Sequence, residues 1–156
     1  MSTFVSLHVL TLTDKQASLW KLRSLNLSIS EIASRLGISR QAVHRSLQVI
    51  DMKVYKALTS VATACKVEIK RIDVKKGFLV GWSPWLGVDV YITFSVKNGV
   101  QVWFKHKGNC KECSLRDECR RILLSEAEER GISLPKDDRI EPSQLAEIFF
   151  KELLKG

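Results

Sequence analysis

The chain has 156 residues, of which 25 are Lys or Arg and 17 are Asp or Glu, giving a formal net charge of +8. This length suits one compact domain or two small ones. No apolar run approaches the roughly 20 residues of a membrane span, and residues 1–12 lack the basic start and cleavage site of a secretory signal. We therefore expect a cytoplasmic protein with no membrane partner.

Positive charge is concentrated in the first two thirds of the chain. Residues 1–109 contain 16 Lys and Arg against 6 Asp and Glu, whereas residues 110–156 contain 9 against 11. A basic region attracts the phosphate groups of nucleic acids. A solvated basic surface has the same composition, so the motifs within this region have to decide its role.

Three helices are predicted in residues 13–50. Thr13, Ser30 and Ser39 can each cap the start of a helix. Gly37 stands where the turn between the second and third helices needs a positive φ. The first helix should end near residue 24, and its apolar stripe is formed by Leu19, Leu22 and Leu25.

The second and third helices have the pattern of a helix-turn-helix. Ala33 is small enough for the two helices to cross closely, and the angle between them would be filled by Leu36, Ile38, Val43 and Leu47. The open face of the third helix keeps residue types that read base edges and grip phosphates. We predict that bases are read by Arg40, Gln41 and His44. The residues predicted to contact the DNA backbone are Ser39, Arg45, Arg35 and Lys15.

Residues 12–16 and 27–43 resemble sigma-factor region 4, the LuxR-type regulators and the archaeal Tfx regulators. The resemblance covers about forty residues of the chain. It implies that a leading helix supports the pair and that the third helix enters the major groove of double-stranded DNA. A plain helical hairpin is the alternative that the spacing alone leaves open.

A long helix is predicted after the motif, because there is no Gly or Pro between Leu47 and Gly77. It could continue to about Ile69. Apolar residues alternate spacings of three and four, as in a coiled-coil seam, at Leu47, Ile50, Val54, Ala57, Val61 and Ala64. We expect two copies of the chain to form a homodimer along this seam. Their two motifs would then read DNA half-sites that lie about one turn of the double helix apart. The alternative is a helix packed on the sheet of its own chain.

The hydrophobic period changes to that of strands after Lys70. Residues 88–96 alternate apolar and polar side chains, Asn98-Gly99 indicates a tight turn, and residues 100–104 continue the apolar face. Residues 78–82 should form a third strand. We predict that this hairpin belongs to a small α+β unit; a DNA-touching wing is the alternative. The tryptophans expected to be packing residues, rather than a stacking surface for single strands, are Trp82, Trp85 and Trp103.

Two helices are predicted at the end of the chain. The first runs from Asp117 to Arg130 and the second begins at Pro142, with a buried face of Leu145, Ile148, Phe149 and Leu153. The fold class is therefore α+β. We divide it into a helix-turn-helix domain (1–50), a linking and dimerisation helix (51–70) and a metal-binding α+β domain (71–156).

The spacing C-x2-C-x5-C at Cys110, Cys113 and Cys119 is the second chemical feature. Three thiols within ten residues of an intracellular protein are more often metal ligands than disulfide partners. The segment resembles the iron–sulfur loops of endonuclease III-type glycosylases and of WhiB-type regulators. That resemblance implies a [4Fe–4S] cluster with a fourth cysteine.

The fourth metal ligand is open. Trp103 stands where the glycosylase pattern has its first cysteine, which leaves Cys65 for a cluster. His106, four residues before Cys110, would instead complete a Cys3His zinc site. The remaining alternative is a loop without metal, in which the cysteines are small core residues.

Together these features predict a sequence-specific, homodimeric DNA-binding transcriptional regulator that is not an enzyme. We find no paired carboxylates placed beside a Lys on strands, no phosphate-cradling Gly loop and no nucleophile with a partnered base. The alternatives are an iron–sulfur enzyme that processes nucleic acid, and an initiation accessory factor that binds RNA polymerase.

Overall fold

The computed structural model describes residues 12–106 and 108–155. It is an α+β fold, as predicted, and it contains a four-stranded antiparallel sheet. The elements in chain order are α1 (Asp14–Ser24), α2 (Ile29–Leu36), α3 (Arg40–Ala64), β1 (Glu68–Asp73), β2 (Phe78–Ser83), β3 (Val88–Ser95), β4 (Gly99–Phe104), the 3-10 turn η1 (Cys110–Glu112), α4 (Arg116–Glu129) and α5 (Pro142–Leu153). Among the described helices, none has the length and apolar character needed to cross a membrane.

The first three helices begin at side-chain caps. Thr13 and Ser39 cap α1 and α3 as predicted. The predicted cap Ser30 is wrong, because α2 begins two residues earlier. Ser28 Oγ accepts from the Glu31 backbone N–H at 3.2 Å, and the Glu31 carboxylate accepts from the Ser28 N–H at 2.7 Å. This reciprocal pair satisfies two of the free N–H groups at the helix start, which a cap at Ser30 would not do.

The helix α3 is one continuous helix of 25 residues that contains both the third helix of the motif and the predicted linking helix. It ends at Ala64 rather than near Ile69, since Lys66 adopts a positive φ of 54° and β1 begins at Glu68. Strand β1 was not predicted from the sequence. It lies at the edge of the sheet with most of its residues exposed, so its residues lack the alternation that marks a half-buried strand.

The sheet has the strand order β1-β2-β3-β4, with every neighbouring pair antiparallel. The predicted hairpin is confirmed: Ser95 pairs with Gly99, and Gly99 takes a φ of 67° in the connecting turn. The predicted strand at residues 78–82 is β2. Because the sheet is a simple meander, all four strands come from one segment, residues 68–104.

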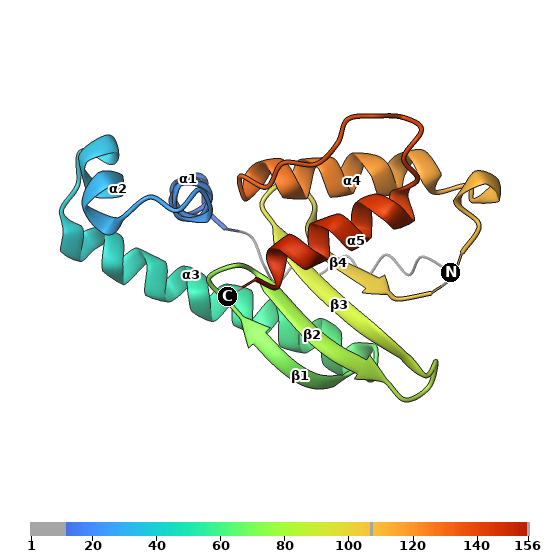
Figure 1. The fold of residues 1–156 in the computed structure, drawn as a ribbon. Coiled ribbons are helices and arrows are strands. Elements are labelled where there is room, and N and C mark those ends of the chain that lie inside the picture. Colours follow the sequence, from blue (N-terminus) through green and yellow to red (C-terminus); the bar gives the residue numbers. More distant parts are fainter. Residues whose placement is uncertain (1–11, 107, 156) are drawn as a thin grey trace.

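Helices cover both faces of the sheet (Figure 1). One apolar cluster runs from α1 and α2 along α3 to the nearer face of the sheet and includes Trp20, Leu47, Val54 and Ile92. A second cluster lies under α4 and α5 and includes Phe78, Leu123 and Phe149. The arrangement has three layers, with the sheet in the middle.

The predicted coiled-coil seam is buried inside the chain. Leu47, Ile50, Val54, Ala57 and Val61 are all buried, and only Ala64 of the seam is exposed. The structure therefore has the intrachain alternative, in which this stripe packs on α1, α2 and the sheet. A homodimer would have to use other residues.

Three predicted packing positions are wrong. Leu25 and Ile148 are 46% and 36% exposed. Trp20 of α1 and Phe150 of α5 are buried instead. Trp85 is 87% exposed at the turn between β2 and β3, whereas Trp82 and Trp103 are partly buried. Leu25 and Trp85 lie outside the regular elements, at the C-cap of α1 and in a turn, whereas Ile148 lies within α5 on its exposed side.

Candidate nucleic-acid interface and cysteine loop

The turn between α2 and α3 has the geometry expected of a helix-turn-helix. Gly37 takes a left-handed φ of 64°, and the Ile38 N–H donates to the Ala33 carbonyl at 3.1 Å. Ile32 and Ala33 of α2 share a buried apolar cluster with Val43 of α3. The short helix α2 is thus held against the start of α3 by a buried apolar contact.

Polar contacts attach α1 to α3. The Arg23 guanidinium and the Asp51 carboxylate form an ion pair at 2.6 Å, with both side chains largely covered. Lys53 Nζ donates to the Gln16 side-chain oxygen at 2.8 Å. These contacts make α1 a support for α3. We call residues 13–50 the head.

The head is also attached to the rest of the protein. Trp20 is fully buried, meets the Phe94 ring of β3 edge-on at 5.1 Å and donates from Nε1 to the Glu129 carboxylate at 3.0 Å. Glu129 is the last residue of α4, the helix that lies on the opposite face of the sheet from α3 (Figure 1). The head is therefore held against two other elements through one side chain.

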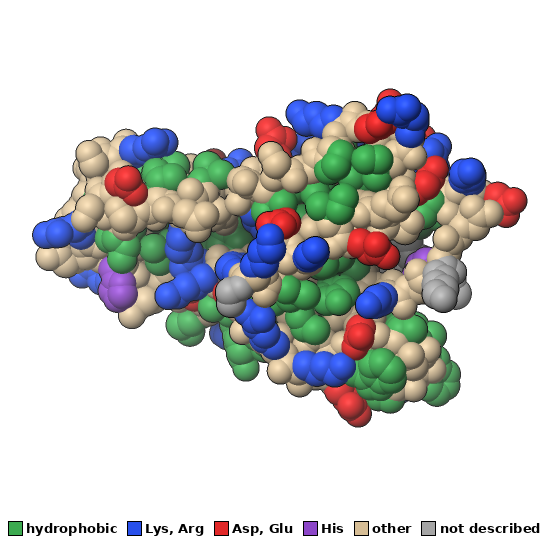
Figure 2. Space-filling view, viewed as in Figure 1, with side chains coloured by type: hydrophobic (Ala, Val, Ile, Leu, Met, Phe, Trp, Pro, Cys, Tyr) green, Lys and Arg blue, Asp and Glu red, His purple; other side chains and the backbone are tan. Residues whose placement is uncertain are grey.

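The face of α3 opposite this core is exposed. Arg40, Gln41, His44 and Arg45 are all exposed, while Val43 and Leu47 between them are buried. The four exposed residues and Ile29 border a shallow hollow. Lys and Arg side chains gather over this part of the molecule and its junction with the rest (Figure 2). The predicted base-reading residues are thus brought together on one surface.

The predicted backbone contacts occupy different places. Arg35 and Lys15 are exposed in the last turn of α2 and the first turn of α1. Ser39 is exposed, but its hydroxyl oxygen already accepts from the Ala42 N–H at 3.1 Å as the cap of α3. Gln48, which was not predicted as a contact residue, is exposed one turn after His44. Helical spacing of four residues from His44 could have identified it.

The cysteine loop, residues 108–119, connects β4 to α4. Cys113 is exposed, and Cys110 and Cys119 are half-buried. Burial raises the pKa of the Cys119 thiol, and the neighbouring Cys113 and Cys110 raise it further. Cys110 and Cys113 lie in the connection before α4, and Cys119 lies in the first turn of α4. No group of three or more His, Cys, Asp or Glu side chains in the described ranges is arranged to hold a metal ion.

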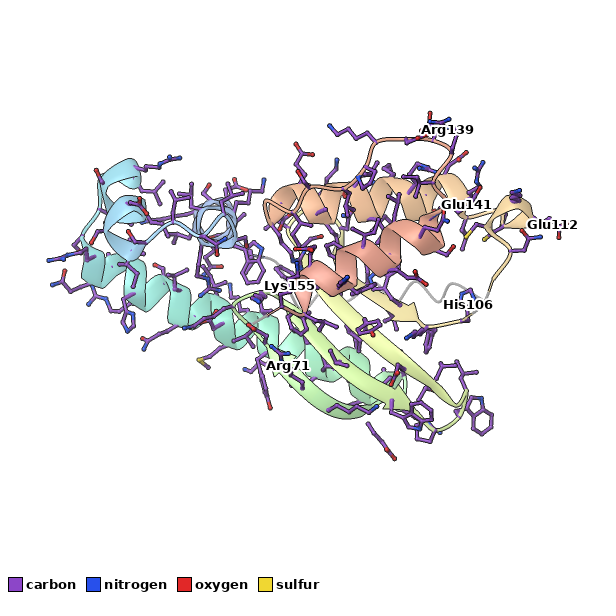
Figure 3. All side chains as sticks on the ribbon, in the orientation of Figure 1. Arg71, His106, Glu112, Arg139, Glu141 and Lys155 are labelled. Atoms are coloured by element: carbon purple, nitrogen blue, oxygen red, sulfur yellow. The ribbon has the colours of Figure 1, made fainter. Side chains whose placement is uncertain are left out.

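The two candidates for a fourth ligand lie in different environments. Cys65 caps the C-terminal end of α3 and packs against the apolar cluster on that face of the sheet. His106 is exposed at the end of β4, on the same side as the loop that carries Glu112 (Figure 3). Its ring packs over Gly108, where a Cβ would come within 2.7 Å of Cε1.

A buried polar pair lies between the sheet and α4. Burial raises the pKa of Glu126 to about 7, although the charge of Arg130 and a 3.0 Å hydrogen bond from Thr93 oppose the rise. The Arg130 guanidinium donates to the backbone carbonyls of Gly77 and Phe94 at 3.3 and 2.6 Å. One oxygen of Glu126 has no hydrogen-bond partner among the described residues. This pair fixes the register of α4 on the sheet.

Comparisons of the chain with protein-family models, with curated proteins and with solved structures found no match.

Proposed function

We propose that this protein is a sequence-specific regulator of transcription that binds double-stranded DNA through α3. The observation that carries the proposal is the exposed face of Arg40, Gln41, His44 and Arg45 above a buried apolar base. Arg and Gln make bidentate hydrogen bonds to guanine and adenine in the major groove. Because α2 and α3 are fixed by a glycine turn and a dry contact, these side chains are presented in one arrangement.

The regulator acts in the cytoplasm in this proposal, and it has no catalytic role. Homodimerisation remains part of it, because one helix-turn-helix seldom supplies enough contacts for tight specific binding. The contact cannot use the buried seam. Exposed apolar residues on the outer face of α3 are Val49, Met52 and Tyr55. An accessory factor that binds RNA polymerase is the alternative, and co-purification of polymerase would distinguish it.

The test is selection of duplexes from a random oligonucleotide pool by the full chain. Gln41→Ala should relax the preference at one base pair, with a loss of discrimination of about 1–3 kcal/mol, or roughly 5- to 150-fold. Ser60→Ala, an exposed change near the other end of α3, is the control and should leave the selected sequence unchanged. Binding without any preference in the unmodified protein, or an unchanged preference in Gln41→Ala, would contradict the proposal.

We also propose that Cys110, Cys113 and Cys119 hold a metal. Three thiols within ten residues have the chemistry and the spacing of metal ligands, and metal binding would draw together side chains that are not arranged around an ion in the described ranges. A [4Fe–4S] cluster usually takes four thiolates, and Cys65 packs elsewhere. His106 is exposed and lies four residues before Cys110 on the same connection, so the proposal takes the Cys3His set that suits zinc. When bound, the metal would crosslink the end of β4 to the start of α4.

Metal analysis and an absorption spectrum of anaerobically purified protein test this second proposal. Retained zinc without colour supports the Cys3His site, and a broad band near 400 nm that bleaches in air supports the cluster. Cys113→Ser should lose the metal, because it removes one thiolate ligand. Since Cys113 is exposed, we expect this substitution to leave the fold intact. Cys65→Ala should retain it if His106 is the fourth ligand. Protein free of both zinc and iron after anaerobic purification would overturn the proposal.

A further inference from the structure

A cleft of about 790 Å³ lies at the junction between the head and the rest of the protein. One wall is formed by the start of α2 and by the segment of α3 from His44 to Asp51. The opposite wall is formed by the turn between β1 and β2 and by the end of α5. Residues that line this junction cleft include Ser28, His44, Gln48, Lys75, Lys76 and Leu153.

The turn between β1 and β2 lies beside the middle of α3 (Figure 1). Because α3 and β1 are consecutive and β1 runs back from the end of the helix, residues 74–77 return toward the head. This turn carries Lys75 and Lys76. Both line the same cleft as His44, which belongs to the exposed face of α3.

The carboxylates of the cleft have polar partners. Asp51 is paired with Arg23 at 2.6 Å, Glu152 is paired with Lys155 at 2.6 Å, and Asp73 accepts from the Lys76 backbone N–H at 3.0 Å. The Arg23 and Lys155 charges offset those of Asp51 and Glu152, and the backbone hydrogen bond holds the Asp73 carboxylate in the turn. A ligand that enters the cleft therefore meets the lysines of the turn.

The two lysines of the turn are not paired with carboxylates. Lys76 Nζ donates to the backbone carbonyls of Leu153 and Lys155, which are neutral. Lys75 is exposed, and no carboxylate of the described residues lies within ion-pairing distance of it. Lys155, which is paired with Glu152, and Arg71 also lie on this side of the molecule (Figure 3). The cleft mouth thus suits an anion.

The position of the cleft relative to α3 identifies that anion. The major groove is about 12 Å wide and an α-helix with its side chains is about 10–12 Å across. A helix in the groove is therefore flanked by both phosphate backbones. His44 and Gln48 form one wall of the cleft, so one backbone would pass along its mouth, opposite Lys75.

We propose that the junction cleft receives the phosphodiester backbone of one DNA strand, and that Lys75 neutralises a phosphate there while α3 reads the bases. This inference rests on the proposed function. It makes the turn between β1 and β2 a second, sequence-independent contact on DNA. The turn belongs to the body of the protein, so binding would involve both walls of the cleft at once.

The test measures the affinity of the full chain for a selected duplex over a series of salt concentrations. Each neutralised phosphate contributes about 0.9 to the slope of log K against log[salt]. Lys75→Ala should therefore reduce the slope by about 1 and leave the preferred sequence unchanged. Lys136→Ala, a change of an exposed lysine in the loop between α4 and α5, is the matched control and should leave the slope unchanged.

A second arm replaces single phosphates of the duplex by neutral methylphosphonates. At one position flanking the bases read by α3, the replacement should weaken binding of the unmodified protein and have little effect on Lys75→Ala. If Lys75→Ala changes neither the slope nor this sensitivity while Gln41→Ala still relaxes the sequence preference, the cleft contact is wrong and the proposed function stands. If the unmodified protein does not bind duplex DNA at low salt, both are wrong.

Discussion

In the head, the exposed candidate side chains lie above a buried apolar base, whereas in the cysteine loop they do not. Arg40 and His44 are one turn apart on a helix whose other face holds Val43 and Leu47 in the core. The described residues of the loop from Gly108 to Leu115 include none that is buried. Packing can therefore fix the geometry of the first site, and a bound metal would have to fix that of the second.

The largest expected effect tests whether the head is held as firmly as its contacts indicate. Trp20→Ala removes a fully buried ring that touches Phe94 and Glu129. We expect the free energy of unfolding to fall by about 3–5 kcal/mol, with the head and the sheet unfolding in one transition. Chemical denaturation followed by far-UV circular dichroism and by tryptophan fluorescence measures both quantities.

Trp85→Ala is the matched control for Trp20→Ala. The same residue type is 87% exposed at Trp85, so its removal should change the free energy of unfolding by no more than about 0.5 kcal/mol. Equal effects of the two substitutions, or separate transitions for the head and the sheet, would show that the head is not anchored through Trp20.

The next prediction concerns α4, which carries Cys119 of the loop. The folded state raises the pKa of Glu126 to about 7, above its usual value of 4.5, mainly by burial. Between pH 4.5 and 7 the folded protein therefore binds more protons than the unfolded chain. The stability that the protonated Glu126 side chain contributes is lost as the pH rises through that window. At ~1.4 kcal/mol per pKa unit, the loss is on the order of 3 kcal/mol.

Glu126→Gln should remove this part of the pH dependence, because the amide oxygen can still accept from Thr93 but no longer titrates. Unfolding free energies measured at several pH values between 4 and 8 provide the comparison. Glu128→Gln, an exposed change on the same helix, should follow the unmodified protein. A Glu126→Gln curve parallel to that of the unmodified protein would mean that Glu126 is ionised in the fold.

The difference between the two sites also explains what the sequence could predict. The caps Thr13 and Ser39, the turn at Gly37 and the hairpin at Asn98-Gly99 follow from short-range hydrogen bonding and backbone sterics, and all are confirmed. The fourth ligand of a metal site depends on which distant segment lies beside the loop. Spacing along the chain carries no such information, so Cys65 and His106 could not be ranked.

Long-range packing limited the other predictions in the same way. The seam of α3 has a spacing that suits either a second copy or a sheet, and only the fold showed that the sheet of the same chain covers it. The cleft beside Lys75 involves segments more than a hundred residues apart. Its lysines were counted in the basic two thirds of the chain, but their position opposite α3 depends on the path of the unpredicted strand β1.

The smallest expected effect distinguishes the two serines at the start of α2. Ser28 caps the helix and exchanges two hydrogen bonds with Glu31. Ser30, which the sequence had favoured, is exposed within the first turn. Loss of an N-terminal serine cap costs about 1 kcal/mol, so Ser28→Ala should lower the free energy of unfolding by about that amount. Ser30→Ala removes no cap hydrogen bond and should be nearly neutral.

The same pair of substitutions relates stability to the head's surface. The side-chain and backbone hydrogen bonds with Ser28 hold the pKa of Glu31 below its ordinary value, so its carboxylate is ionised while the cap is formed. In Ser28→Ala the start of α2 should fray. Ile29, at the start of α2, borders the same hollow as the exposed residues of α3 that are proposed to read bases. DNA affinity should therefore fall with stability in Ser28→Ala and remain unchanged in Ser30→Ala. A loss of stability and DNA affinity in Ser30→Ala alone would mean that Ser30, and not Ser28, caps α2.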